Sequence, residues 1–261
     1  MYSKHFLNGI CYYTKGDYKN QPVIFIHGNS LSALTYRNQL NQEKVPVIAL
    51  DLPGHGNSVT PTNKKETYCI SGYAQTINEF IATLNIKEFI LAGHSLGGHV
   101  AIETAPELEG IKGLLVFGTP PIGIPPEMEK MFLPNPFMPL LFSGVITQED
   151  AENLALQMTS DAELKDEIQK LINDTDPDAR IFLGTSVAEG KFKNEKELIT
   201  NLEIPVWMIH GTNDAFVNYE YLKNICGINP ILEIDSGHTP QLERPEQFNQ
   251  IINYIYSSIF K

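Results

Sequence analysis

The feature that most constrains the fold of this chain is a strand pattern that passes into a helix pattern through a serine flanked by glycines. The residues from Phe89 to Ala92 are all apolar, as in a buried strand, and Gly93-His-Ser-Leu-Gly97 follows directly. Residues 98–105 then have the pattern of a helix. A turn from strand to helix within two residues strains the turning residue and leaves room only for glycine on either side. We therefore expect the Ser95 hydroxyl to be exposed at a helix N-terminus.

Other apolar runs predict further buried strands, separated by helix patterns. The expected strands are residues 9–14 (an edge strand), 22–26, 45–50, 111–117, 205–211 and 228–234, and the expected helices of the core are 33–41, 70–84 and 245–259. Strands and helices that alternate at this spacing imply right-handed crossovers. The predicted fold class is therefore α/β, with a mostly parallel central sheet and helices on both faces.

The alternation stops at Gly118. Seven prolines lie between Pro120 and Pro139 and prevent a continuous helix there. Helix patterns resume at Thr147-Gln-Glu-Asp150, which resembles a capping box, and continue to residue 201. We predict a helical lid, residues 119–203, inserted after the strand at 111–117, which we take as the sixth strand of the fold. The core domain is then made of residues 1–118 and 204–261.

The charge of the chain excludes some classes of partner. Its formal net charge is −12, and residues 121–203 hold 16 acidic but only 7 basic side chains. This acidic stretch predicts a solvated outer face. The alternative, functional interpretation is that it weakly disfavours anionic substrates. Because the sequence has no basic patch to hold phosphates, we expect no nucleic-acid partner.

Apolar run lengths and cysteine usage lead to an expected location. Neither a run of signal-peptide length near Met1 nor a stretch of 18 apolar residues is present, so we expect no membrane partner. The three cysteines, Cys11, Cys69 and Cys226, are scattered and odd in number. This pattern argues against a disulfide framework and favours a reducing compartment. The expected location is the cytoplasm, and oligomeric state is not predicted.

A reactive serine requires a base and a group that orients the base, because its hydroxyl is too weakly acidic to attack unaided. Reactive groups in an open parallel sheet gather at the carboxyl ends of the strands. His238 follows the last predicted strand and Asp214 follows the preceding one. The chain order Ser95, Asp214, His238 is the order found with a serine on this kind of turn. We predict that these three residues are catalytic, with Asp235 as the rival acid.

The tetrahedral intermediate of acyl transfer requires two N–H donors for its oxyanion. We predict that they are the backbone amides of Leu96, directly after the serine, and Asn29, on the loop after the strand at 22–26. His27, on the same loop, is interpreted as a structural histidine rather than a second base. His94 and His99 flank the nucleophile, and His94 is a candidate substrate contact.

Apolar side chains are concentrated in the proline-rich part of the predicted lid. One hypothesis is that they roof a pocket above Ser95 and receive an acyl chain; the alternative is that they only pack the lid onto the core. The candidate substrate-binding residues here are Met131, Phe132, Phe137, Met138 and Phe142. The dispersed histidines form neither His-x-His-x-Asp-His nor His-Glu-x-x-His, and Gly-x-Gly-x-x-Gly and P-loop motifs are absent. We therefore expect no metal and no cofactor.

Over essentially its whole length the chain resembles the α/β-hydrolase superfamily. The residues that carry this resemblance are His27-Gly28, Asp51-Leu-Pro-Gly-His-Gly-Asn-Ser58, Gly93 to Gly97, Asp214 and Gly237-His238. The resemblance implies an α/β-hydrolase fold with a serine nucleophile. The haloalkane dehalogenases of this fold share the His-Gly-Asn turn but have aspartate at the position of Ser95.

A closer resemblance is to the metal-independent N-acylhomoserine lactonases of the same fold. It is carried by His27-Gly-Asn-Ser30, Asp51 to Ser58, Gly72-Tyr-Ala74, Ser95-Leu-Gly-Gly-His99, Gly118-Thr-Pro-Pro121 and Phe216-Val217. Those lactonases can carry glutamate at the position of Asp214. The predicted lid is less similar, and the lid is the part that selects the substrate.

These patterns together favour one class of reaction. We expect a serine hydrolase that cleaves a carboxylic ester or lactone with a small to medium apolar acyl group through an acyl-enzyme, with an N-acylhomoserine lactone as one candidate. The alternatives are a carbon–carbon bond hydrolase, an amidase or a perhydrolase with the same triad, or a ligand receptor of the same fold.

Overall fold

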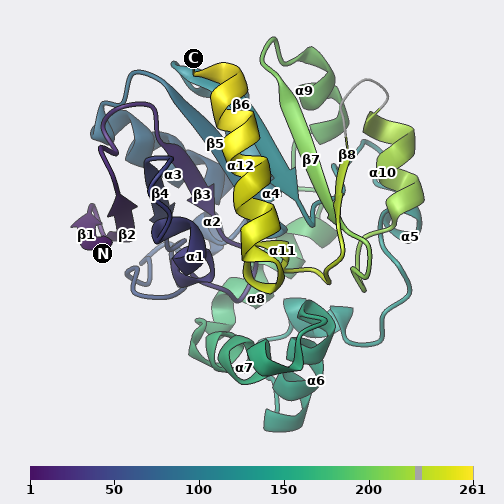
Figure 1. The fold of residues 1–261 in the computed structure, drawn as a ribbon. Coiled ribbons are helices and arrows are strands. Elements are labelled where there is room, and N and C mark those ends of the chain that lie inside the picture. Colours follow the sequence, from purple (N-terminus) through teal and green to yellow (C-terminus); the bar gives the residue numbers. More distant parts are fainter. Residues whose placement is uncertain (227–230, 261) are drawn as a thin grey trace.

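The computed structural model describes residues 1–226 and 231–260, and it contains one eight-stranded sheet (Figure 1). The strands are β1 (Ser3–Leu7), β2 (Ile10–Lys15), β3 (Val23–Ile26), β4 (Val47–Leu50), β5 (Phe89–His94), β6 (Ile111–Phe117), β7 (Val206–Gly211) and β8 (Ile231–Ile234). Their order across the sheet is β1-β2-β4-β3-β5-β6-β7-β8. The pairs β1–β2 and β2–β4 are antiparallel, and all later pairs are parallel. The predicted mostly parallel sheet is confirmed.

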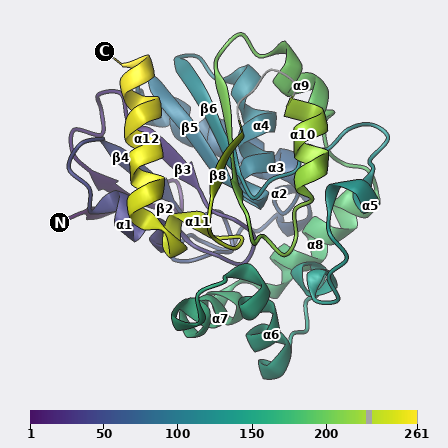
Figure 2. The same ribbon diagram turned by 45° about the vertical axis from the view of Figure 1, so that its right-hand side comes forward.

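The described residues form helices as well as strands, and some of these helices cover the two faces of the sheet. The helices are α1 (Arg37–Leu40), α2 (Lys64–Thr67), α3 (Ile70–Leu84), α4 (Leu96–Thr104), α5 (Met128–Met131), α6 (Gln148–Met158), α7 (Lys165–Asp174), α8 (Pro177–Ala188), α9 (Glu195–Asn201), α10 (Tyr219–Cys226), α11 (Pro240–Glu243) and α12 (Pro245–Ile259). Figures 1 and 2 show α12 crossing one face, with α3 and α4 on the other. This arrangement gives the sheet a buried core on each side.

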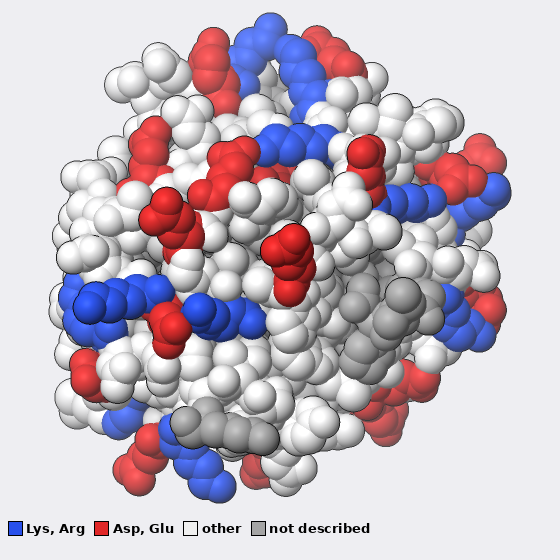
Figure 3. Space-filling view, turned by 90° about the horizontal axis from the view of Figure 1, so that it is seen from above, with Lys and Arg blue, Asp and Glu red and all other residues white. Residues whose placement is uncertain are grey.

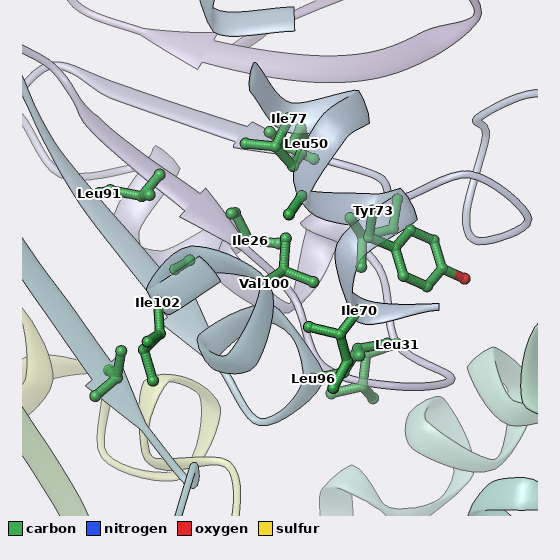
Figure 4. Packing of buried hydrophobic residues seen from close by; sticks show 14 of the residues in the cluster. Ile26, Leu31, Leu50, Ile70, Tyr73, Ile77, Leu91, Leu96, Val100 and Ile102 are labelled. Atoms are coloured by element: carbon green, nitrogen blue, oxygen red, sulfur yellow. The ribbon is translucent and has the colours of Figure 1, made fainter. Parts of the chain in front are cut away.

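Alternate residues of each strand contribute to the two cores, because side chains along a strand point to opposite faces. Phe25 and Ala92 pack with Phe248 of α12 on one face. The opposite face is covered by α3 and α4, whose side chains pack against Ile26, Leu50 and Leu91 in Figure 4. The carboxyl ends of β3 and β5 are therefore held between two packed layers, which makes them a rigid base for a site.

The element boundaries agree with the sequence predictions where the apolar pattern is strong. The helices at 70–84 and 245–259 and the strand at 111–117 have the predicted bounds. The predicted edge strand is wrong in position, because β2 lies between β4 and β1, and β1 forms the edge. The sequence analysis missed β1, which is largely exposed, and also α2, α10 and α11. Residues 228–230 of the last predicted strand lie outside the described residues.

The long connection between β6 and β7 contains α5 to α9. Its prolines limit the first part to short turns, α5 and the 3-10 turn Met138–Phe142. The capping box of Thr147 and Asp150 is present at the start of α6. In Figures 1 and 2, α6 and α7 form a separate layer beyond one end of the sheet, while α9 returns to pack on α4.

Charged side chains of both signs are mixed on the face opposite α6 and α7. Figure 3 shows lysine and arginine interspersed with aspartate and glutamate on this face, outside the residues drawn in grey. Several charged side chains of the protein are paired, for example Lys112 with Glu88 at 3.1 Å and Lys193 with Glu107 at 2.6 Å. Surface pairs of this kind add little stability. Within the described residues, no helix combines the length and apolarity needed to span a membrane.

Candidate active site

Ser95 occupies the sharp turn between β5 and α4. Its backbone has φ 50° and ψ −117°, a strained combination for a residue with a side chain. The turn is held because the Ser95 amide donates a hydrogen bond to the Phe117 carbonyl oxygen at 2.8 Å. A Cβ atom on Gly93 would lie 2.2 Å from the Gly97 oxygen, and one on Gly97 would lie 2.3 Å from the Ile26 oxygen. Both glycines are therefore required by close backbone contacts, as the sequence predicted.

Two backbone amides stand beside Ser95 without a protein acceptor. Leu96 is the first residue of α4, and Asn29 follows β3; within the described residues neither amide donates a hydrogen bond to the protein. Asn29 and Leu96 line the same cavity as Ser95. The Asn29 side chain donates instead to the Leu141 oxygen at 2.7 Å, which fixes its loop against the β6–β7 connection. The two amides are available to a negatively charged oxygen on substrate.

His238 and Asp214 form a buried pair on the loops after β8 and β7. His238 Nδ1 lies 2.8 Å from Asp214 Oδ2, and the two side chains are 5% and 1% exposed. The other carboxylate oxygen of Asp214 accepts hydrogen bonds from the amides of Phe216 and Val217. Burial alone raises the pKa of Asp214, but the His238 ring and these two amides outweigh it and bring the pKa below its ordinary value. Asp214 is therefore ionised and holds the ring in one orientation.

The rival acid, Asp235, does not contact His238 in the described structure. Its side chain is exposed and accepts a hydrogen bond from Asn213 Nδ2 at 2.9 Å.

The loop that carries His238 is held by Glu243, whose carboxylate accepts hydrogen bonds from the amides of Gly237 and Thr239. The structure thus brings Ser95 and His238 to one cavity and pairs Asp214 with His238.

Three further histidines, His27, His55 and His94, are fully or almost fully buried. His27 Nε2 accepts a hydrogen bond from the Leu52 amide at 2.9 Å, and its Nδ1 lies 2.8 Å from the Gly28 oxygen, so it ties two loops together. Burial lowers the pKa of His27 to about 4 and that of His55 to about 3. His94 is 0% exposed, and its Nε2 lies 2.7 Å from the His238 carbonyl oxygen. Burial lowers the pKa of His94 as well.

The placement of His94 corrects its assignment as a substrate contact. His94 is the last residue of β5 and lies on the same face as Ala92, where it stacks on Phe117 with ring centroids 5.1 Å apart. Side chains alternate along a strand, so His94 shares the sheet face of Ala92 and Phe117, and it is not part of the cavity lining. Its contact with the His238 backbone gives it a supporting position instead.

The cavity above Ser95 has mostly apolar walls. The space between its walls, including the part open to solvent, is about 690 Å³. Its lining consists of Asn29, Ile70, Ser95, Leu96, His99, Gly118, Ile122, Met128, Phe132, Met138, Leu141, Phe142, Leu183, Val187, Phe216 and His238. Of the predicted substrate-binding residues in the β6–β7 connection, Phe132, Met138 and Phe142 line it, whereas Met131 and Phe137 pack elsewhere in the core and do not.

Several lining residues were missed by the sequence analysis. Leu183 and Val187 lie four residues apart on α8, and that spacing places them on one face of the helix. His99 lies four residues after Ser95, on the helix that begins beside it. In both cases the helical spacing was a usable signal. No such signal marked Ile70 or Ile122, whose positions depend on long-range packing.

The cavity wall is tied to the loop that carries the acid. Phe132 forms an isolated bridge with Val217, and the Leu133 amide donates to the Phe216 oxygen at 2.7 Å. Asn135 Nδ2 donates to the Ala215 oxygen at 3.2 Å. Phe132 and Asp214 are therefore positioned by the same pair of segments. Among the described residues, no group of three or more histidine, cysteine, aspartate or glutamate side chains is arranged to hold a metal ion.

The sheet order, the strained serine turn after β5 and the His–Asp pair on the last two loops define a protein of the α/β-hydrolase type. A sequence model described as the alpha/beta hydrolase family matches residues 23–251. The chain belongs to this family.

Individual relatives are similar over most of the chain. A Mycoplasma pneumoniae protein that is provisionally named an esterase/lipase is 26% identical, with 92% of each chain covered. The AB hydrolase superfamily protein YisY of Bacillus subtilis is 25% identical and covers 89% of this chain and 90% of its own. Among solved structures, a mutant of the N-acyl homoserine lactonase AidH complexed with N-hexanoyl homoserine has a TM-score of 0.92 at 26% identity, covering 100% and 98% of the two chains.

Proposed function

We propose that this protein is a serine hydrolase that cleaves a carboxylic ester or lactone with an apolar acyl group through an acyl-enzyme. The observation that carries the proposal is the buried pair of His238 and Asp214 at a cavity that also contains Ser95 on a strained turn. Membership of the alpha/beta hydrolase family and the similarity to proteins named as esterases, lipases and a lactonase support it.

In the proposed reaction, Ser95 Oγ attacks the carbonyl carbon while His238 Nε2 accepts the hydroxyl proton. Asp214 accepts the Nδ1–H hydrogen bond, which leaves the lone pair on Nε2 for this purpose, and its negative charge stabilises the imidazolium that forms. The amides of Leu96 and Asn29 bind the oxyanion of the tetrahedral intermediate.

Collapse of the intermediate breaks the carbon–oxygen bond to the alcohol, which receives the proton from His238. Water, activated by the same base, then attacks the acyl-enzyme, releases the acid and restores the Ser95 hydroxyl. In a lactone, the alcohol and the acid remain in one product.

The walls of the cavity favour an apolar acyl group. Phe132, Met138 and Phe142 from the β6–β7 connection face the same space as Ser95. We propose that this connection, predicted as a lid over residues 119–203, selects the substrate. The solved structure of AidH with N-hexanoyl homoserine makes an N-acyl homoserine lactone a substrate to test first. The cytoplasmic location remains a prediction.

The experiment is a panel of p-nitrophenyl esters from acetyl to decanoyl and N-acyl homoserine lactones of matched acyl length, each followed to many turnovers. A hydrolase releases product at a steady rate after the first turnover. A ligand receptor that reacts once releases no more product than there is protein. Cleavage of amide or carbon–carbon substrates in preference to every ester and lactone would contradict the proposal.

A further inference from the structure

His99 is a polar residue of the cavity that the proposed reaction does not use. It lies on α4 four residues after Ser95, which is about one helical turn of 5.4 Å along the helix axis. Its side chain is 11% exposed and lines the cavity. On the opposite edge of the ring, Nδ1 lies 2.8 Å and 3.0 Å from the two carboxylate oxygens of Glu195.

Glu195 holds the His99 ring from a fully buried position. It is the first residue of α9, is 0% exposed, and also accepts a hydrogen bond from the Ile122 amide at 2.8 Å. Among the described residues His99 is its only ion-pair partner. Burial raises the pKa of Glu195, and His99 is the largest influence opposing that rise. Asp214 accepts two backbone amides besides His238 and has a lowered pKa, whereas Glu195 accepts only the Ile122 amide besides His99 among the described residues. The buried charge of Glu195 is therefore less well compensated, and the His99–Glu195 pair avoids a buried net charge by sharing one ionisable proton.

A neutral pair fixes the hydrogen-bonding character of the other ring nitrogen. Whether the shared proton lies on the carboxyl or on Nδ1, Nε2 of His99 then carries a hydrogen. Within the described residues Nε2 has no hydrogen-bond acceptor in the protein. It is also not among the fully buried side-chain nitrogen and oxygen atoms that lack a partner, so the atom is accessible. His99 therefore presents an N–H donor to the cavity.

The walls of the cavity that His99 lines are mostly apolar. Ile122, Met128 and Val187 are further lining residues of the same cavity. A substrate alkyl chain that covers this N–H group would displace solvent water from it and leave the donor without a hydrogen bond. A substrate oxygen at the same place would accept the hydrogen bond instead. A site built with such a donor discriminates against analogues that lack the acceptor.

We propose that His99, held by Glu195, determines specificity by donating a hydrogen bond from Nε2 to a keto or amide oxygen in the acyl chain of the substrate, a few bonds from the reacting carbonyl. The proposal rests on the proposed function, because it takes Ser95 as the point of attack. In these terms Glu195 is a positioning residue, which acts by setting the proton on Nε2.

The test compares methyl hexanoate with its 4-oxo and 5-oxo analogues, with acid release followed by titration. His99→Asn keeps an amide nitrogen near the Nδ1 position for Glu195 and removes the Nε2 donor. His99→Gln is the matched control, since its amide nitrogen reaches the Nε2 position. Glu195→Gln can keep its amide oxygen on the Ile122 amide and place its amide nitrogen against Nδ1. Nδ1 then accepts a hydrogen bond, so Nε2 keeps its hydrogen.

The wild-type protein is expected to prefer one oxo ester over methyl hexanoate in kcat/KM by about tenfold, the value of one hydrogen bond. The preference, measured as the ratio of the oxo ester to methyl hexanoate within each protein, disappears in His99→Asn, persists in part in His99→Gln and is retained in Glu195→Gln. A structural role for the pair would instead lower all three esters equally.

An equal loss on all three esters, or cleavage by the wild type without preference, overturns this proposal and leaves the proposed function intact. Failure of the wild type to cleave any ester or lactone overturns the proposed function and this proposal with it.

Discussion

On the sheet side of the cavity, Ser95, Asp214 and His238 are positioned by hydrogen bonds and tight turns, whereas on the other side Phe132 and Met138 pack against the apolar core. We call the first region the platform: the three triad candidates with the loops of Asn29 and Leu96. The second is the apolar wall: the cavity-lining residues of the β6–β7 connection, namely Ile122, Met128, Phe132, Met138, Leu141, Phe142, Leu183 and Val187.

The two regions respond differently to change because their interactions differ in kind. A hydrogen bond to a reacting group is present or absent, and its geometry has narrow limits. Apolar contacts are individually weak and non-directional, so removing a few of them shifts affinity gradually. We therefore expect steep losses for changes in the platform and graded changes for the apolar wall.

The steepest loss is expected for Ser95→Ala. The change removes the nucleophile and should lower kcat by about 10⁶-fold, while the oxyanion donors and the cavity leave a small residual rate. Thermal unfolding should be unchanged, because only a hydroxyl on the turn is lost. The control is Ser71→Ala, a serine of α3 that donates to Glu103, which should retain wild-type turnover. A wild-type kcat in Ser95→Ala would show that Ser95 is not the nucleophile.

Asp214→Asn tests the orientation of the base. An amide cannot hold the His238 ring in the required tautomer, so kcat should fall by about 10⁴-fold. Asp235→Asn is the matched control, because Asp235 is exposed and bonded only to Asn213 among the described residues. Steady-state rates of both variants on one ester provide the comparison. A larger loss in Asp235→Asn would reverse the choice of acid.

Acid should destabilise the platform through its buried histidines, and residues 119–203 contain no histidine. The pKa of His27 is about 4 in the folded protein, against about 6.5 in an unfolded chain. Below pH 6.5 the unfolded state therefore binds the extra proton. The contribution of neutral His27 to the free energy of unfolding is fully present above pH 6.5. It is lost as the pH falls toward 4, and the loss is about 3 kcal/mol.

Urea unfolding of the wild type and His27→Gln at pH 7 and pH 4.5 measures this effect. Glutamine can accept the Leu52 hydrogen bond but does not titrate, so the variant should lose less stability between the two pH values. An equal loss in both proteins would show that the acid sensitivity arises elsewhere.

The smallest effect is expected at the apolar wall. Each methylene buried there is worth about 0.8 kcal/mol, so kcat/KM should rise about fourfold per acyl carbon until the wall ends. Phe132→Ala should flatten this rise and leave acetyl ester cleavage nearly unchanged. Phe137→Ala is the control, since Phe137 does not line the cavity. Equal rates for acetyl, butyryl and hexanoyl esters, with chemistry limiting, would mean that these residues only pack the segment onto the core.

Much of the platform could be predicted from the sequence because short-range geometry specifies it. Gly93 is required by a backbone contact within the turn, and the strand ends that carry Asp214 and His238 follow from alternating apolar runs. Gly97 also follows from the motif, although the contact that requires it is with the Ile26 oxygen of β3. The alternation of side chains along a strand would also have placed His94 correctly. It lies two residues after Ala92 and therefore shares the sheet face of Ala92, and it does not line the cavity.

The apolar wall was predictable only in part, because no local pattern states which apolar residue faces a cavity. Met131 and Phe132 are neighbours in a proline-broken segment, yet Met131 is buried in the core and Phe132 lines the cavity. The partner of His99 is equally hidden, since Glu195 lies 96 residues further along the chain. Such contacts depend on how the β6–β7 connection packs and on nothing within one element.

The most direct test of the central claim is to trap the covalent intermediate. The protein is mixed with a p-nitrophenyl alkylphosphonate, which reacts as an analogue of the tetrahedral intermediate, and the adduct is located by mass spectrometry of the intact chain and its peptides. We predict one phosphonyl group per chain, on the peptide that contains Ser95, with loss of esterase activity in proportion and no adduct in Ser95→Ala. Sustained ester hydrolysis with no adduct, or an adduct on another residue that accounts for the lost activity, would contradict the account.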